Sequence, residues 1–160
     1  MLFRSDNYGV PRICYVNKMD RSGASFTRCV DMIKKRLGAR PLPVQLPIGS
    51  EDNFKGMIDL VLMKALVWDS DDRDAKPAEL DITPDIADKL GITVPTDKQL
   101  LAKIPDYRKE LVDTCLEMDD AAMEAYLLEE KDPSAETLVA CLRKGTVTGA
   151  FTPEIGRAHV

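Results

Sequence analysis

The sequence predicts an α/β fold in which a short strand and a helix are followed by a longer, mixed α+β region. The first observation is the run of apolar, partly β-branched residues 13–16, which polar Asn17 ends abruptly, as expected of a buried strand. The second is a helical apolar stripe that begins at Phe26, and the third is an apolar/polar alternation from Pro41 onward. With 44% hydrophobic residues among 160, the chain can bury a core of ordinary size as one or two small domains.

Polar side chains follow the predicted strand at once. A strand that stops at Val16 delivers Asn17, Lys18 and Asp20 together at its carboxyl edge, which is where open α/β sheets bind ligands. The alternative is a polar turn after a strand, because the Asn-Lys-x-Asp tetrad fixes only three residue types. These residues are therefore a candidate ligand-binding site.

The chemistry of the tetrad matches guanine. The Asp20 carboxylate offers two acceptor oxygens, and guanine presents two neighbouring donors, its ring N1–H and its exocyclic amino group, which adenine lacks. Asn17 carries a donor and an acceptor, which suit the O6/N7 edge of guanine or a tie between neighbouring loops. The apolar stem of Lys18 is able to lie against the flat base while its ammonium stays in water.

A helix is predicted directly after this loop. Ser22 or Ser25 is the predicted N-cap of this helix, and Gly38 is predicted to end it. The basic residues 34–36 complement the helix dipole in the last turn. A solvated face explains these basic residues better than contact with RNA. The apolar stripe consists of Phe26, Cys29, Val30, Ile33 and Leu37.

Several strands are predicted next. Residues 41–48 alternate between apolar and polar and are expected to form one strand, with prolines that mark an edge or its ends. Residues 57–62 and 63–68 are two further strand-like runs. We expect Lys64 on the solvent-exposed face of this sheet. Trp68 is expected in the core or packed on the sheet rather than stacked on a base.

Short elements follow. Residues 69–74 are acidic but lack the central Gly and closing Glu of a calcium loop, so they predict an exposed turn. Residues 80–82 add a strand. Thr83 and Pro84 then start a short helix that Gly91 stops.

Three helices are predicted in the last third of the chain. Apolar residues at helical spacing mark residues 107–118, 122–127 and 135–142. The last of these helices starts after Asp132-Pro133-Ser134 and ends before Gly145. Packing against the preceding strands explains the stripes, and a helical surface that awaits a partner is the alternative. A returning strand begins at residues 151–153.

Composition excludes several classes of protein. The net charge of −5 argues against a stand-alone nucleic-acid binder, and no apolar run reaches the roughly eighteen residues of a membrane span. The four cysteines form no Cys-x-x-Cys pair, which suits reduced thiols and gives no zinc site. The single histidine, His159, nearly excludes a histidine-based triad, and Asp119 and Asp120 are expected on a solvated face rather than as an acid/base pair.

Further motifs surround the tetrad. They are Val10-Pro11-Arg12, Asn17-Lys18-Met19-Asp20-Arg21, Gly23-Ala24, Arg36-Leu37-Gly38-Ala39, Gln45-Leu46-Pro47-Ile48-Gly49, Phe54-Lys55-Gly56, Asp59-Leu60-Val61, Met63-Lys64-Ala65-Leu66, Trp68 and Met123-Glu124-Ala125-Tyr126-Leu127. With these motifs, roughly residues 6–153 resemble the elongation factor G family of translational GTPases. Residues 92–103 depart from the family, whose members pass more directly from the acidic strand to the next long helix.

The resemblance implies a fold and a division of the chain. The fold is part of a P-loop GTPase domain, a Rossmann-like three-layer α/β structure, carrying an α+β insert. Residues 6–40 would belong to the GTP-binding domain, residues 41–149 to the inserted subdomain, and residues 150–153 to the start of the strand that returns.

The resemblance also implies a function in protein synthesis. Asn17, Lys18 and Asp20 would bind the guanine base of GTP in a monomeric GTPase that moves tRNA and mRNA on the ribosome, with the insert facing the ribosomal stalk protein. Mg²⁺ is expected in the intact protein. The sequence has no Gly-x-x-x-x-Gly-Lys-Ser/Thr phosphate loop and no catalytic or metal-binding residue that we can assign, so the chain alone is expected to be inactive.

Alternatives remain within and beyond this family. A ribosome-recycling, peptide-release or ribosome-protection GTPase would carry a similar tetrad, and contacts with tRNA and mRNA would lie in other domains. A non-enzymatic ribosome-docking module is the alternative from another class. The expected location is the cytoplasm, or the matrix of a mitochondrion or plastid.

The two ends of the chain resemble translated sequencing-library adapter. Residues 1–5 and 154–160 are therefore expected to be non-native and to make few packed contacts. The strand 13–16 is expected to lack its sheet neighbours and to expose unpaired edges.

Overall fold

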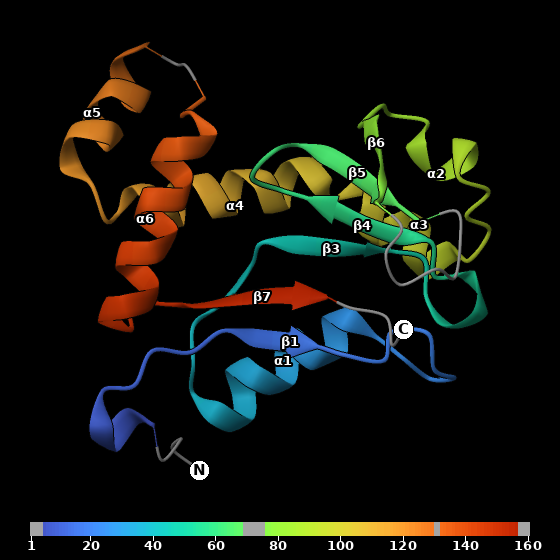
Figure 1. Cartoon of the computed structure of the whole chain (residues 1–160), viewed down its shortest axis with the longest axis horizontal. Helices are drawn as coiled ribbons and strands as arrows, with labels where there is room; N and C mark the ends of the chain where they lie inside the picture. Colours follow the sequence, from blue (N-terminus) through green and yellow to red (C-terminus); the bar gives the residue numbers. More distant parts are fainter. Residues whose placement is uncertain (1–4, 69–75, 130–131, 157–160) are drawn as a thin grey trace.

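The computed structural model describes residues 5–68, 76–129 and 132–156, and this part of the chain forms two sheets with helices around them (Figure 1). One sheet is parallel and the other antiparallel, so the predicted mixed α/β class is confirmed. The strands are β1 (Cys14–Val16), β2 (Pro41–Pro43), β3 (Gln45–Ile48), β4 (Gly56–Asp59), β5 (Lys64–Val67), β6 (Ala78–Asp81) and β7 (Thr152–Gly156). The helices are α1 (Phe26–Leu37), α2 (Ile86–Lys89), α3 (Pro95–Ala102), α4 (Ile104–Leu116), α5 (Asp120–Glu129) and α6 (Ala135–Thr148), with 3-10 turns at Asp6–Tyr8 and Glu51–Asn53.

The parallel sheet has the order β1-β7-β2, so the last strand of the chain lies in its middle. Cys14 of β1 and Pro43 of β2 both lie opposite Glu154 of β7, on its two sides. The expectation that strand 13–16 lacks sheet neighbours is therefore wrong, because β7 returns to pair with it. Its expected burial is also wrong in part, since Tyr15 is 62% exposed.

The carboxyl-terminal end of the described chain is built into this sheet. Residues 154–156 continue β7, and the Glu154 side chain is 0% exposed. The expectation that this end makes few packed contacts is therefore wrong for residues 154–156. The predictions for residues 1–4, 69–74 and 157–160 fall outside the described residues. Residues 41–43, which the sequence predicts to belong to the insert, form strand β2 of the parallel sheet.

The predicted strand 41–48 is in fact two strands in different sheets. Val44, between β2 and β3, donates its N–H to the Glu154 carbonyl oxygen at 2.9 Å, and its own carbonyl oxygen accepts the Leu60 N–H at 3.0 Å. Both prolines of β2 lie in an edge strand, where their missing N–H groups disrupt no ladder. The chain therefore crosses from one sheet to the other at Val44.

The antiparallel sheet has the order β3-β4-β5-β6, with consecutive strands joined in sequence. Its inner face is fully buried at Leu46, Ile58 and Ala65, each 0% exposed. Trp68, expected in the core or packed on the sheet, is 42% exposed and so lies outside the core, because it follows the last paired residue of β5. The β6 side chains are all exposed at the sheet edge.

Helix α1 confirms its sequence pattern at both ends. Ser25, rather than Ser22, caps the helix, since its Oγ accepts the Arg28 N–H at 3.4 Å. Gly38 ends it in the left-handed conformation with φ 64°. α1 lies along the parallel sheet, below β1 in Figure 1, and contacts β2.

Helix α6 extends past its predicted end. Gly145 is buried inside the helix, and the left-handed residue that ends it is Gly149, with φ 75°. A Cβ at position 145 would clash with the Phe151 ring, so this glycine allows α6 to lie close to the start of β7. The predicted N-cap is confirmed, since Ser134 Oγ accepts the Thr137 N–H at 3.2 Å.

Helix α3 lies within residues 92–103, the stretch predicted to depart from the family, and α2 precedes that stretch. α2 begins at Ile86 rather than Pro84, because residues 84–85 form a turn in which the Thr83 carbonyl accepts the Ile86 N–H at 2.9 Å. α3 packs against β3 and buries Leu100 and Leu101. α4 then packs against α6, which encloses the core between these helices and the sheets.

Candidate functional site

The residues after β1 form an exposed loop at the carboxyl end of a parallel strand. Asn17 and Lys18 are exposed and Asp20 is half-buried, whereas Met19 is 2% exposed and packs into the core. Lys18 has φ 62°, a left-handed conformation that a residue other than glycine holds only when its surroundings fix it. Met19 therefore anchors the loop from below while Asn17 and Lys18 face solvent.

Local hydrogen bonds close this loop onto the start of α1. The Arg21 N–H donates to the Lys18 carbonyl oxygen at 3.2 Å, and the Ala24 N–H donates to the Arg21 carbonyl oxygen at 3.0 Å. The Arg28 guanidinium donates through Nη2 to the Gly23 carbonyl oxygen at 2.6 Å. Residues 17–24 are thus two consecutive turns joined to the first turn of α1.

Glu51 holds the same loop from the other side, and sequence reasoning missed it. Its N–H donates to the Met19 carbonyl oxygen at 2.9 Å, and its carboxylate Oε1 accepts the Gly23 N–H at 2.5 Å. Glu51 and Gly23 are 28 residues apart in sequence. A polar residue in a turn after a glycine is common, so the sequence carries no signal that Glu51 supports the loop. Only its contacts in the folded structure show this role.

The structure places Asn17, Lys18 and Asp20 in this one loop. The Asn17 and Lys18 side chains make no hydrogen bond to any other residue in the described part of the chain, which leaves their polar groups available to a ligand. A carboxylate, an amide and a cation with an apolar stem can together bind a flat, polar heterocycle.

No three His, Cys, Asp or Glu side chains are grouped to hold a metal ion within residues 5–68, 76–129 and 132–156. The same residues contain no helix long and apolar enough to cross a membrane. Asp119 has a structural role, since its Oδ1 accepts the Ala122 N–H at 3.1 Å in the first turn of α5.

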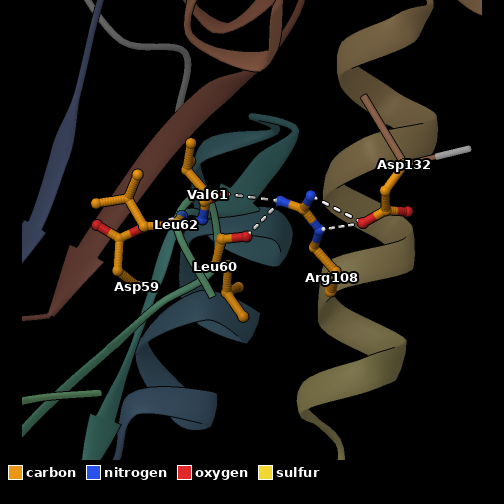
Figure 2. Close-up of polar contacts among 6 residues, drawn as sticks. All are labelled: Asp59, Leu60, Val61, Leu62, Arg108 and Asp132. Atoms are coloured by element: carbon orange, nitrogen blue, oxygen red, sulfur yellow. Dashed lines mark hydrogen bonds and ion pairs between the residues drawn. The ribbon is translucent and has the colours of Figure 1, made fainter. Parts of the chain in front are cut away.

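A second polar cluster ties helix α4 to the turn between β4 and β5 (Figure 2). Arg108 donates through Nη1 to the Leu60 carbonyl oxygen at 2.6 Å and through Nη2 to Asp132 at 3.0 Å. Asp59 Oδ1 accepts the Val61 N–H in the same turn at 2.8 Å. Each nitrogen of the Arg108 guanidinium donates to a protein acceptor, so we assign the cluster a structural role.

Buried titratable groups lie away from the loop. Burial raises the pKa of the Cys115 thiol to about 12, which keeps it protonated and unreactive at neutral pH. Burial likewise raises the pKa of Glu154 to about 7. The neighbouring thiols are Cys141 beside Cys115 and Cys14 opposite Glu154, and burial raises the pKa of each of them too, so both stay protonated at neutral pH.

A shallow hollow of about 580 Å³ follows the outer face of α6. Val139 and Val147 in its lining are 50% and 62% exposed, and Arg143 and Lys144 lie between them. On α5, Leu127 and Leu128 are also largely exposed. These residues form an apolar and cationic surface on the outer helices.

Comparison with known proteins identifies the relatives of this chain. No protein-family model matches it. An elongation factor G of Wolbachia pipientis subsp. Culex pipiens (strain wPip) is 48% identical over 150 residues, which cover 94% of this chain and 20% of that protein. The chain is a homologue of part of elongation factor G. This similarity agrees with the resemblance of the sequence to elongation factor G.

A solved structure agrees with the fold of this elongation factor G homologue. A crystal structure of a protein from Thermus thermophilus matches 96% of the chain and 20% of its own length, with a TM-score of 0.68 and 21% sequence identity. The homologue thus spans about a fifth of the length of the elongation factor G that it matches.

Proposed function

We propose that residues 17–23 are the guanine-binding loop of a translational GTPase of the elongation factor G type. The observation that carries the proposal is the loop itself, in which Asn17 and Lys18 are exposed beside Asp20 at the carboxyl end of a parallel strand, above buried Met19. Homology to elongation factor G supports the same assignment.

The roles follow from the donors and acceptors of guanine. The Asp20 carboxylate accepts hydrogen bonds from the ring N1–H and the exocyclic amino group, and Asn17 binds the O6/N7 edge. The stem of Lys18 covers one face of the base. Adenine offers no matching donor pair, so the loop selects GTP over ATP.

The proposed parent fold is a P-loop GTPase domain of the Rossmann-like, three-layer type. The parallel sheet and α1 would be part of that domain, and the antiparallel sheet with α2–α6 would be the insert. The sequence holds no phosphate-loop motif, and we assign no magnesium ligand or water-orienting residue in it. We therefore propose that the chain alone neither hydrolyses GTP nor binds it tightly.

The intact protein would act on the ribosome as a monomer in the cytoplasm or an organelle matrix. There it would use GTP hydrolysis to move tRNA and mRNA, which it would contact through other domains. The apolar and cationic surface of α5 and α6 supports contact between the insert and the ribosomal stalk protein. A recycling, release or ribosome-protection GTPase is the alternative within the same class.

Replacing Asp20 by Asn in an intact protein that carries this segment tests the proposal. The new amide presents a donor to guanine where the carboxylate accepted, which costs roughly 2–4 kcal/mol, or about 30- to 1000-fold in GTP affinity. Xanthine carries a carbonyl in place of the amino group, so affinity for xanthosine triphosphate should rise. Competition binding with the two nucleotides measures both changes.

The matched control is Asp119→Asn. Asn keeps the side-chain oxygen that accepts the Ala122 N–H at the start of α5, far from the loop in sequence. We expect this variant to keep the preference for GTP. An unaltered preference in the Asp20→Asn protein would refute a role of Asp20 in reading the base.

A further inference from the structure

The loop at residues 17–23 is held by a residue from the opposite side of the crossover at Val44. Glu51 lies after β3, in the antiparallel half of the molecule, yet its backbone N–H and its carboxylate both contact the loop. Its N–H binds the carbonyl oxygen of Met19 and its carboxylate binds the N–H of Gly23, so it spans the loop from one end to the other.

The conformation of Glu51 is itself fixed by its neighbours. Its φ of 52° is left-handed, and Gly49 two residues earlier has φ 81°. A Cβ at position 49 would clash with the Asn53 carbonyl oxygen, so this glycine is required for the tight turn that presents Glu51. A left-handed glutamate is costly and persists here because the turn and the loop constrain it together.

The turn that carries Glu51 is also attached to helix α3. Ser50 Oγ lies 3.2 and 3.0 Å from the two carboxylate oxygens of Asp97, to which it donates. Asp97 is only 8% exposed and sits in the part of α3 that packs against β3. A hydrogen-bonded path therefore runs from Asp97 through Ser50 and Glu51 to Gly23.

We propose that Glu51 is a positioning residue for the guanine-binding loop and that the Ser50–Asp97 contact couples the loop to helix α3. The proposal deepens the proposed function and rests on it for the ligand, but its geometry concerns this chain alone. Movement of α3 alters the position of Ser50. The Glu51 N–H passes that change to Met19, between Lys18 and Asp20, and the Glu51 carboxylate passes it to Gly23.

Amide hydrogen exchange of the ¹⁵N-labelled 160-residue chain tests the positioning role. Glu51→Ala removes the acceptor of the Gly23 N–H, and exchange of that amide should accelerate about tenfold. Glu51→Gln keeps a side-chain carbonyl acceptor and should restore most of the protection. Asp52→Ala, which removes a neighbouring exposed carboxylate, should leave Gly23 unchanged, as should the Leu60 amide in every variant.

Ser50→Ala tests the coupling to α3. The variant keeps Glu51 but frees the turn from Asp97, so exchange at Gly23 should again accelerate and the amide shifts of residues 17–23 should move. Unchanged Gly23 exchange in Glu51→Ala, or an equal change in Asp52→Ala, would overturn the positioning role. Shifts confined to α3 in Ser50→Ala would overturn the coupling.

Titration with guanosine and adenosine separates this inference from the proposed function. Guanosine should shift the amides of residues 17–20 in the unaltered chain, and Glu51→Ala should weaken this binding about tenfold without creating a response to adenosine. If guanosine shifts nothing in the unaltered chain, the proposed ligand is wrong. The exchange of Gly23 still decides whether Glu51 holds the loop.

Discussion

Glu154 occupies the most unfavourable environment of any described carboxylate. It lies in the middle strand of the parallel sheet, is 0% exposed, and neither carboxylate oxygen has a hydrogen-bond partner in the described structure. Cys14 opposite it and Tyr107 on α4 are the neighbouring titratable groups, and burial is the first cause of the raised pKa of each. The charge of Arg12 lowers the pKa of Cys14 and so opposes part of this rise. Burial therefore favours the protonated form of Glu154.

Glu154 should make the chain less stable as pH rises. Its pKa is raised from 4.5 to about 7 in the folded state, so the folded state binds more protons between these values. The free energy of unfolding should fall by about 3 kcal/mol as pH rises from about 4.5 to above 7. Glu154→Val should remove this dependence and raise stability at pH 8. Urea unfolding at pH 5 and pH 8 measures both effects.

The control for this pH dependence is Glu124→Gln, which changes an exposed carboxylate on α5. It should keep the slope of the unaltered chain. An equal slope in Glu154→Val and the unaltered chain would show that another group causes the dependence.

Local sequence predicted the candidate site only where its residues are contiguous. Asn17, Lys18 and Asp20 directly follow a strand, and such a pattern is recognisable because a strand end fixes where the next residues lie. Glu51 reaches the loop across 28 residues, and its left-handed φ has no signature in a glutamate. Contiguous candidate residues are therefore easier to find in a sequence than the distant residues that support their loop.

Single elements were predicted well where one periodicity governed them. The stripe and caps of α1 predicted its start and end, because each signal is local. The break between β2 and β3 was missed because alternation continues through Val44, although its hydrogen bonds change sheets there. Gly145 was read as a helix end because sequence does not distinguish a terminating glycine from one that permits close packing.

Two glycines of α6 should therefore respond differently to alanine. Gly145→Ala places a Cβ against the buried Phe151 ring and should lower the free energy of unfolding by about 1–3 kcal/mol. Gly149→Ala only strains a left-handed C-cap, with open space around its Cβ, at about 1 kcal/mol. Chemical denaturation of both variants gives these values.

Repeating both glycine substitutions in a Phe151→Leu variant separates the effect of overpacking from that of helix propensity. In Phe151→Leu, the smaller side chain should relieve the clash, so Gly145→Ala should cost less than in the unaltered chain. Gly149→Ala should cost the same in both backgrounds. Additive effects for Gly145→Ala would mean that Phe151 is not the reason for the glycine.

At the scale of the whole molecule, the two sheets share one junction. The Glu154 carbonyl oxygen binds Val44, and the Val44 carbonyl oxygen binds Leu60, so β7 is joined through the crossover to the turn after β4. Arg40 adds a bidentate pair at 2.7 Å to Glu117 at the end of α4. The half-exposed pair contributes little alone, but it lies next to the β2–β7 pairing. The two sheets are thus parts of one connected structure.

This connection predicts the effect of shortening the chain. All residues that pair with β1 lie at 154–156, so a chain that ends at Pro153 leaves β1 unpaired and exposes Val16, now 6% exposed. At pH 5, where Glu154 is mainly protonated, we expect a loss of at least about 2 kcal/mol in the free energy of unfolding. Deletion of residues 157–160 keeps every β1 pair and should change it far less. Urea unfolding of the two truncated chains, with amide exchange at Val16, tests this, and equal stability of the 1–153 and 1–156 chains would contradict it.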